Sequence, residues 1–230
     1  MRRRPQDLLS LHLTGGGATA WNDLRALADE RQRPVLVAER RHEPDDDEHP
    51  RRGAGNHARV RPRSPVALDE LLQGAREREG GRGLWLALDC LQDPHNVGAI
   101  FRTAAFYGAQ GIILTRDRSA PLSGAAHDAA AGGLEIVPYA QPANLAQSIR
   151  SAQEAGLWVL GSSERGEKTP AEVPRDRPWL LVIGGEEQGM RQLTERHCDL
   201  VVCLAPCGPL ATLNASVAAG VLMAALQGVS

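Results

Sequence analysis

Short apolar runs that alternate with helical stretches constrain the fold of this chain more than any other feature. Six runs of strand length follow Gly83, and helical patterns separate most of them. The runs are Leu84 to Leu88, Gly111 to Thr115, Leu134 to Pro138, Leu157 to Gly161, Trp179 to Ile183 and Leu200 to Leu204. The helical patterns cover Val97 to Tyr107, Ala143 to Ala155 and Met190 to His197. This alternation predicts an α/β fold with a mostly parallel sheet that helices cover on both faces.

The first 65 residues differ from the rest of the chain in their pattern of apolar and charged residues. An apolar run from Leu8 to Leu13, a helical pattern from Trp21 to Ala28 and a second apolar run from Pro34 to Ala38 predict a small β-α-β fragment. Acidic and then arginine-rich sequence from Arg40 to Pro65 predicts a solvated linker, with a basic arm that touches nucleic acid as the less favoured alternative. We therefore expect an N-terminal domain with its linker at residues 1–65 and a second domain at residues 66–230. The second domain should begin with a linking helix from Ala67 to Arg78.

Ligands of parallel sheets bind beyond the carboxyl ends of the strands, so the loops after Leu88, Ile183 and Leu204 are the candidate site. In the first loop Pro94 ends the extended segment, Asn96 is placed to cap the next helix, and Gly98 permits close backbone approach. Arg102 follows beside the apolar stripe of that helix, where it either snorkels or pairs with an acid unless it has a function.

The other two loops combine small residues with polar side chains. Glycines at 184, 185 and 189 surround Glu186, which suits a ligand lying on bare backbone, although ordinary turn chemistry explains them equally well. Prolines and a glycine between Ala205 and Pro209 predict an irregular loop. Thr212 and Asn214 then precede a helix of small residues, a composition that lets other backbone approach closely.

Composition excludes several classes of protein. The 230 residues carry a net charge of −2, which argues against indiscriminate binding of polyanions by the whole chain. No apolar run approaches the roughly 20 residues that span a bilayer, and no signal peptide follows the basic N-terminus, so we expect a cytoplasmic protein without a membrane partner. Cys198, Cys203 and Cys207 with His197 lack the usual zinc spacing, which favours reduced thiols over a metal site.

Three ordered segments together resemble the SpoU (TrmH-type) RNA 2′-O-ribose methyltransferases of the SPOUT superfamily. They are Asp93-Pro94-His95-Asn96-Val97-Gly98-Ala99-Ile100-Phe101-Arg102, then Leu181-Val182-Ile183-Gly184-Gly185-Glu186-Glu187-Gln188-Gly189-Met190, then Leu213-Asn214-Ala215-Ser216-Val217-Ala218. The likeness covers roughly Leu84 to the C-terminus. The runs from Arg116 to Ala120 and from Leu193 to Asp199 resemble the subgroup that modifies a 23S rRNA guanosine, and a tRNA substrate stays open.

The resemblance implies a C-terminal trefoil knot, bound S-adenosylmethionine, and a homodimer whose active site is completed across the interface. It implies that the cofactor lies on Gly184, Gly185, Leu204 and Leu213, with no metal required. By the same motifs the catalytic group is Arg102, Glu186 and Asn214, with Asn96 ordering the loop around Arg102 and Thr212 keeping a hydroxyl. A guanidinium is almost never neutral. We therefore expect Arg102 to hold an RNA phosphate and stabilise the developing alkoxide, while Glu186 and Asn214 fix the ribose and Arg102.

Two departures from the family pattern leave an alternative function open. The family usually has serine where this chain has Thr212, and it places proline directly after the residue that matches Leu204, whereas here Ala205 intervenes. The N-terminal substrate-binding domain of larger relatives also looks incomplete. The alternative is a non-catalytic RNA-binding member of the same fold.

Overall fold

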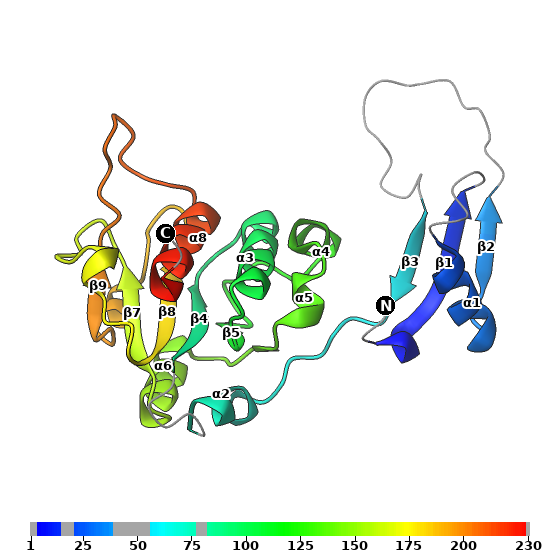
Figure 1. Cartoon of the computed structure of the whole chain (residues 1–230), viewed down its shortest axis with the longest axis horizontal. Coiled ribbons are helices and arrows are strands. Elements are labelled where there is room, and N and C mark those ends of the chain that lie inside the picture. The colour runs from blue at the N-terminus through cyan, green and yellow to red at the C-terminus, as the bar shows by residue number, and fades with distance from the viewer. Residues whose placement is uncertain (1–3, 15–20, 39–55, 77–81, 229–230) are drawn as a thin grey trace. The chain divides into compact units, whose positions relative to one another are not determined.

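The computed structural model describes residues 4–14, 21–38, 56–76 and 82–228 (Figure 1). The chain divides into two compact units, Met1–Ser64 and Pro65–Ser230. Each unit has its own sheet and its own hydrophobic core.

The N-terminal unit contains a three-stranded sheet in the order β2-β1-β3. Its elements are η1 (Pro5–Asp7), β1 (Leu8–Thr14), α1 (Asn22–Glu30), β2 (Val35–Ala38) and β3 (His57–Val60). The parallel pairing of β1 with β2 confirms the predicted β-α-β fragment. Strand β3 pairs antiparallel with β1. The prediction that His57 to Val60 belong to a linker was therefore wrong, because four residues are too few to show the alternation of a strand before its partner strand is known. The part of the predicted linker from residue 40 to residue 55 lies outside the described residues.

The larger unit is built on a six-stranded, wholly parallel sheet in the order β6-β5-β4-β8-β7-β9. Its elements are α2 (Leu68–Arg76), β4 (Gly83–Asp89), α3 (Pro94–Phe106), β5 (Gly111–Leu114), α4 (Gly124–Ala130), α5 (Gly133–Ile136), β6 (Tyr139–Ala140), α6 (Leu145–Glu154), β7 (Trp158–Ser162), η3 (Pro170–Glu172), β8 (Pro178–Gly184), α7 (Gln192–Glu195), β9 (Leu200–Val202) and α8 (Ala215–Gln227).

Helices cover both faces of this sheet, as the alternating pattern predicts (Figure 1). Successive side chains of a strand point to opposite faces, so Leu84, Leu86 and Leu88 of β4 pack under α3, α4 and α8. Trp85 and Ala87 point the other way and pack against α2 and α6. The chain therefore forms three layers, helices on sheet on helices.

One predicted strand of this unit was wrong, one predicted helix is shorter than expected, and one helix was not predicted. The run from Leu134 to Pro138 is not a strand: its first residues form the single helical turn α5, and the strand β6 begins only at Tyr139. Gly132, with φ of 94°, starts that turn, and Gly133 packs directly on the backbone of Phe101, so the local chain cannot extend. The helix predicted at Met190 to His197 is shortened to α7, and α4 was not predicted at all.

No helix in the described parts of the chain is both long and apolar enough to cross a membrane.

Candidate functional site

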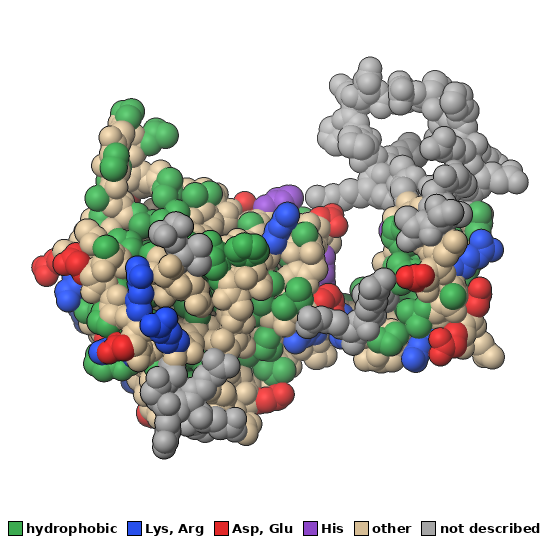
Figure 2. All heavy atoms as spheres, in the orientation of Figure 1, with side chains coloured by type: hydrophobic (Ala, Val, Ile, Leu, Met, Phe, Trp, Pro, Cys, Tyr) green, Lys and Arg blue, Asp and Glu red, His purple; other side chains and the backbone are tan. Residues whose placement is uncertain are grey.

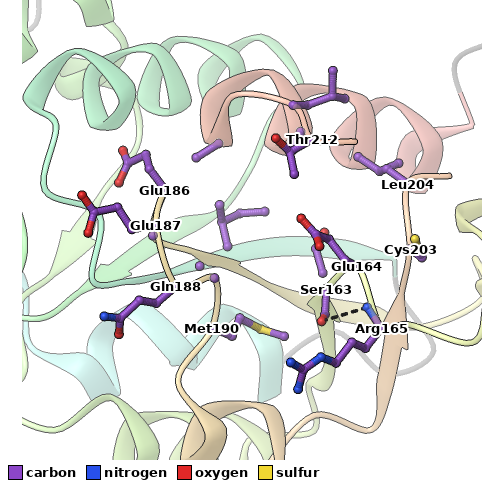
Figure 3. A pocket seen from close by; sticks show the side chains of 18 of the residues that line it. Ser163, Glu164, Arg165, Glu186, Glu187, Gln188, Met190, Cys203, Leu204 and Thr212 are labelled. Atoms are coloured by element: carbon purple, nitrogen blue, oxygen red, sulfur yellow. Dashed lines mark hydrogen bonds between the residues drawn. The ribbon is translucent and has the colours of Figure 1, made fainter. Parts of the chain in front are cut away.

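A cavity of about 480 Å³ opens at the carboxyl ends of β7, β8 and β9 (Figure 3). The segment after β8 forms one wall and the segments after β7 and β9 form the other, with the chain leading into α8 closing it. Of the predicted site residues, the wall contains Gly184, Gly185, Glu186, Leu204, Thr212 and Leu213. The loops after Ile183 and Leu204 therefore meet at one site, as expected from the parallel sheet.

The wall contributed by β8 is the glycine loop, residues 184–190. A Cβ atom on Gly184 would lie 2.2 Å from the backbone of Gly189, and one on Gly185 would lie 2.6 Å from the carbonyl oxygen of Cys90. Gly189 has φ of 65° and donates its backbone N–H to the Gly185 carbonyl at 3.0 Å. The glycines are thus required by the closed shape of the loop itself, and that shape leaves bare backbone facing the cavity.

Three predicted polar residues from three separate segments join in one hydrogen-bonded network. Asn96 donates from Nδ2 to Oε1 of Glu186 at 2.6 Å and accepts from Nδ2 of Asn214 at 2.9 Å. Asn96 is buried on α3, whereas Glu186 and Asn214 are exposed beside it. The network fixes the Glu186 carboxylate of the cavity wall and the carboxamide of Asn214, which stands between the lining residues Leu213 and Ala215.

The caps of the two helices explain why these side chains are held in place. Asn214 accepts from the backbone N–H groups of Ser216 at 2.9 Å and Val217 at 3.4 Å, which caps α8 as predicted. The cap of α3 is Asp93, which accepts from the backbone N–H of His95, and not Asn96. The prediction for Asn96 was wrong because Pro94 occupies the first helical position, so the helix begins three residues before the predicted start at Val97.

Arg102 does not contribute to the cavity wall within the described residues. It is exposed on α3 and lines a separate shallow hollow with Phe106, Tyr107, Ala130 and Gly133. In the single chain the predicted guanidinium is therefore placed apart from the wall that carries Glu186.

The sequence analysis missed the ion pair between Asp89 and Arg191. Asp89 is 0% exposed at the end of β4, and its carboxylate accepts from the backbone N of Arg191 at 2.9 Å and from Nε at 2.6 Å. The available signal was an acidic residue that directly ends a strand of apolar side chains, beside the loops already singled out.

The cavity wall carries more acidic than basic side chains. Glu164, Glu186, Glu187 and Glu195 line it together with Arg165. A wall of this composition favours a cationic ligand, because carboxylates attract positive charge more strongly where water is partly excluded.

Two cysteines outside the cavity wall, Cys198 and Cys90, are held as thiols. Burial raises the pKa of the Cys198 thiol to about 12. Burial, followed by the Asp89 carboxylate, raises the pKa of the Cys90 thiol. Across the described ranges no group of three or more His, Cys, Asp or Glu side chains is placed to hold a metal ion, and the zinc alternative with Cys198, Cys203 and Cys207 gains no support.

Residues 83–224 match the model of a family described as the SpoU rRNA Methylase family. A 23S rRNA (guanosine-2'-O-)-methyltransferase RlmB of Pseudomonas aeruginosa is 40% identical over 160 residues, which cover 70% of this chain and 64% of that protein. The enzyme of the same name from Pseudomonas putida is 38% identical over 200 residues, which cover 87% of this chain and 79% of that protein. The match to the P. aeruginosa protein thus spans slightly less than two thirds of its length.

Solved structures show the same fold. The SpoU methyltransferase AviRb from Streptomyces viridochromogenes, in complex with the cofactor AdoMet, superposes with a TM-score of 0.72 at 21% identity, covering 98% of this chain and 87% of that one.

Proposed function

Because the chain belongs to the SpoU rRNA methylase family, we propose that it transfers a methyl group from S-adenosylmethionine to a ribose 2′-hydroxyl of structured RNA. Ribosomal RNA is the favoured substrate, since the relatives from Pseudomonas aeruginosa and Pseudomonas putida are named as 23S rRNA guanosine methyltransferases. The observation that carries the proposal is the network in which Asn96 joins Asn214 to Glu186, a residue in the wall of the cavity. The site of action is then the cytoplasm, where ribosomal RNA is modified in bacteria.

The cavity suits the cofactor in size, shape and charge. A volume of about 480 Å³ lies within the range of roughly 300–1,000 Å³ typical of small-molecule pockets. The glycine loop leaves backbone groups uncovered where a planar base has to approach closely, and the acidic wall suits a sulfonium. We assign cofactor contacts to Gly184, Gly185, Leu204 and Leu213.

When bound, S-adenosylmethionine supplies an electrophilic methyl group, so the protein has to position the hydroxyl, accept or direct its proton and exclude water. We assign the positioning of the ribose to Glu186 and Asn214, whose orientations Asn96 fixes through both ends of its amide. Thr212, in the segment that closes the cavity, supplies a hydroxyl to its lining.

We assign to Arg102 the binding of the RNA phosphate and the stabilisation of the developing alkoxide, acting in the site of a partner subunit. Its exposed position on α3, beside an apolar surface, supports this. Phe106 is 82% exposed, and Val217 and Val221 of the adjoining helix α8 are 50% and 44% exposed. Apolar surface of this kind marks an interaction site, and a homodimer formed through α3 and α8 would cover it.

Two further features are proposed on the family likeness. The C-terminal segment from β9 through α8 forms the trefoil knot, an exception to the rule that chains do not thread loops. The N-terminal unit at residues 1–65 contributes to RNA binding.

The test is transfer of labelled methyl groups from S-adenosylmethionine to 23S rRNA and to a tRNA pool, followed by mapping of 2′-O-methylated nucleotides. Ribose methylation of one rRNA nucleotide is expected. The non-catalytic alternative is motivated by the additional residue Ala205 in the loop after β9. It would be supported if the protein bound RNA but calorimetry detected no binding of the cofactor at millimolar concentration.

A further inference from the structure

A fully buried carboxylate holds both ends of the glycine loop. The loop starts at Gly184, which is the partner of Asp89 in the register of β4 with β8. It ends at Met190, and the next residue, Arg191, returns two hydrogen bonds to the Asp89 carboxylate at 2.9 and 2.6 Å. The segment that forms the cavity wall therefore leaves the sheet at Asp89 and comes back to the same residue.

Burying the Asp89 carboxylate in this ion pair costs free energy, and that cost needs an explanation. The Asp89 side chain is 0% exposed, while that of Arg191 is 38% exposed. Removing a carboxylate from water is unfavourable unless it is paired and hydrogen-bonded, and buried pairs often add little net stability compared with apolar residues of the same size. What such a pair does supply is one defined geometry, which matters most for a segment that contains three glycines.

The backbone of Cys90 also supports a defined conformation of the glycine loop. Cys90, directly after Asp89, has φ of 62°, and its carbonyl oxygen lies where a side chain on Gly185 would have to go. The Cys90 carbonyl thus forms the base on which the loop rests, and Asp89, the residue before it, fixes the position of Arg191. The loop in turn carries Glu186 and most of the wall formed after β8.

We propose that Asp89 is a positioning residue that, through Arg191, holds the glycine loop in the conformation that accepts S-adenosylmethionine and so sets the affinity for this cofactor. The inference rests on the proposed function, because it concerns the same cavity. It adds a residue that touches neither cofactor nor RNA and acts only through the shape of the loop.

The variant Asp89→Asn tests the proposal because it removes the charge at nearly constant volume. The amide keeps one acceptor oxygen, but its NH2 group faces an N–H donor of Arg191, so one of the two bonds is lost. Apparent affinity falls in proportion to the fraction of loop that remains competent, and we expect the Kd for S-adenosylmethionine to rise about tenfold or more. The single-turnover rate at saturating cofactor should stay within about threefold of wild type, because bound cofactor selects the competent loop conformation and with it the position of Glu186.

Two further variants make the test independent of folding. Arg191→Lys keeps the charge and the backbone hydrogen bond but loses the bond from Nε, so it should raise the Kd by less than Asp89→Asn. Asp199→Asn is the matched control: Asp199 also accepts a backbone N–H of this sheet, from Val159 at 2.7 Å, but lies outside the cavity wall. Its Kd should match that of wild type even if its Tm falls.

Calorimetry with S-adenosylmethionine and hydrogen exchange of the amides at 185–191 in cofactor-free protein give the two readouts. Faster exchange and weaker binding in Asp89→Asn and Arg191→Lys, but not in Asp199→Asn, support the proposal. Unchanged exchange and Kd in both variants overturn it, and if Asp89→Asn fails to fold, Arg191→Lys alone decides. Wild-type protein that binds no cofactor would refute the proposed function, while the exchange data would still show whether Asp89 holds the loop.

Discussion

Asn96 is the residue on which the geometry of the site depends most. Its amide is used in both directions, as a donor to Glu186 and as an acceptor from Asn214. The carboxylate and the second asparagine belong to segments 90 and 118 residues away in the chain. Because Asn96 is buried and both partners are exposed, the inner residue defines the direction in which the outer two point.

Replacing Asn96 with aspartate should therefore disable catalysis while leaving the cavity intact. The substitution turns the donor toward Glu186 into a second carboxylate at 2.6 Å, where like charges repel. We expect kcat to fall by about tenfold or more, with the Kd for S-adenosylmethionine within about threefold of wild type. Single-turnover kinetics and calorimetry measure the two quantities, and a normal rate in Asn96→Asp would remove the network from the mechanism.

The thiols should differ in reactivity according to their burial. Only the thiolate is nucleophilic, and a pKa of about 12 leaves Cys198 almost wholly protonated at pH 8. Cys207 is exposed in the loop that leads to α8. Timed alkylation with iodoacetamide at pH 8, followed by peptide mass spectrometry, should label Cys207 at least about a hundredfold faster than Cys198. Equal rates would show that Cys198 is not buried in solution.

At the scale of elements, α3 connects the site to the rest of the fold. Its first residues carry Asn96, its later turns carry Arg102 and Phe106, and α4, α5 and α8 all pack against it. Small residues make these contacts close: a Cβ on Gly98 would lie 2.3 Å from the carbonyl oxygen of Ala126. The position of Asn96 relative to the glycine loop thus depends on how deeply α3 sits against α4.

The substitution Gly98→Ala should separate these helices and destabilise the protein. The added methyl group meets backbone, which cannot rotate away, and overpacking of this kind costs about 1–3 kcal/mol. Gly124→Ala is the control, because a Cβ at Gly124 has no heavy atom within 4 Å among the neighbours of that residue in the described structure. Denaturant unfolding should show the loss for Gly98→Ala and a change within about 0.5 kcal/mol for Gly124→Ala.

At the scale of the whole molecule, several of the exposed apolar side chains lie on α3, on α8 and on the segment that leads into α8. Phe106, Val217 and Val221 are exposed on α3 and α8, and Leu210 and Leu213 are exposed on the segment between β9 and α8. That segment projects from the unit in Figure 1, and Figure 2 shows hydrophobic side chains along it. The proposed homodimer across this surface would cover the apolar side chains and would account for the absence of Arg102 from the lining of its own cavity.

Mixing two inactive variants tests whether the site is shared between subunits. Arg102→Ala and Glu186→Gln should each abolish turnover when alone, with cofactor affinity retained in the first. If Arg102 serves the cavity of the partner subunit, a mixed dimer contains one intact site, and random exchange should restore about a quarter of wild-type activity. Light scattering establishes the dimer beforehand.

The outcome of that mixing separates two arrangements. No recovery from well-exchanged mixed dimers would place Arg102 and Glu186 in the same subunit's site or outside the mechanism. Recovery well above the activity of either variant alone would establish a site shared across the interface.

The sequence by itself determined the features that depend on neighbouring residues along the chain. The apolar runs located most strands of the larger unit, and the order of strands and helices predicted a parallel sheet with ligands at its carboxyl edge. The motifs around Asn96, Glu186 and Asn214 identified three side chains that the fold brings into one network. Local periodicity and residue type suffice for such features, because a strand or a cap is decided within a few positions.

Tertiary structure decided the features that depend on which strands become neighbours. β4 lies beside β8, and for that reason Asp89 can meet Arg191, a pair that no pattern within either segment reveals. The strand expected at residues 134–138 gave way to a helical turn because α3 packs against that stretch. The direction of Arg102 was likewise fixed by the packing of α3, since residues six positions apart on a helix, such as Asn96 and Arg102, project in different directions.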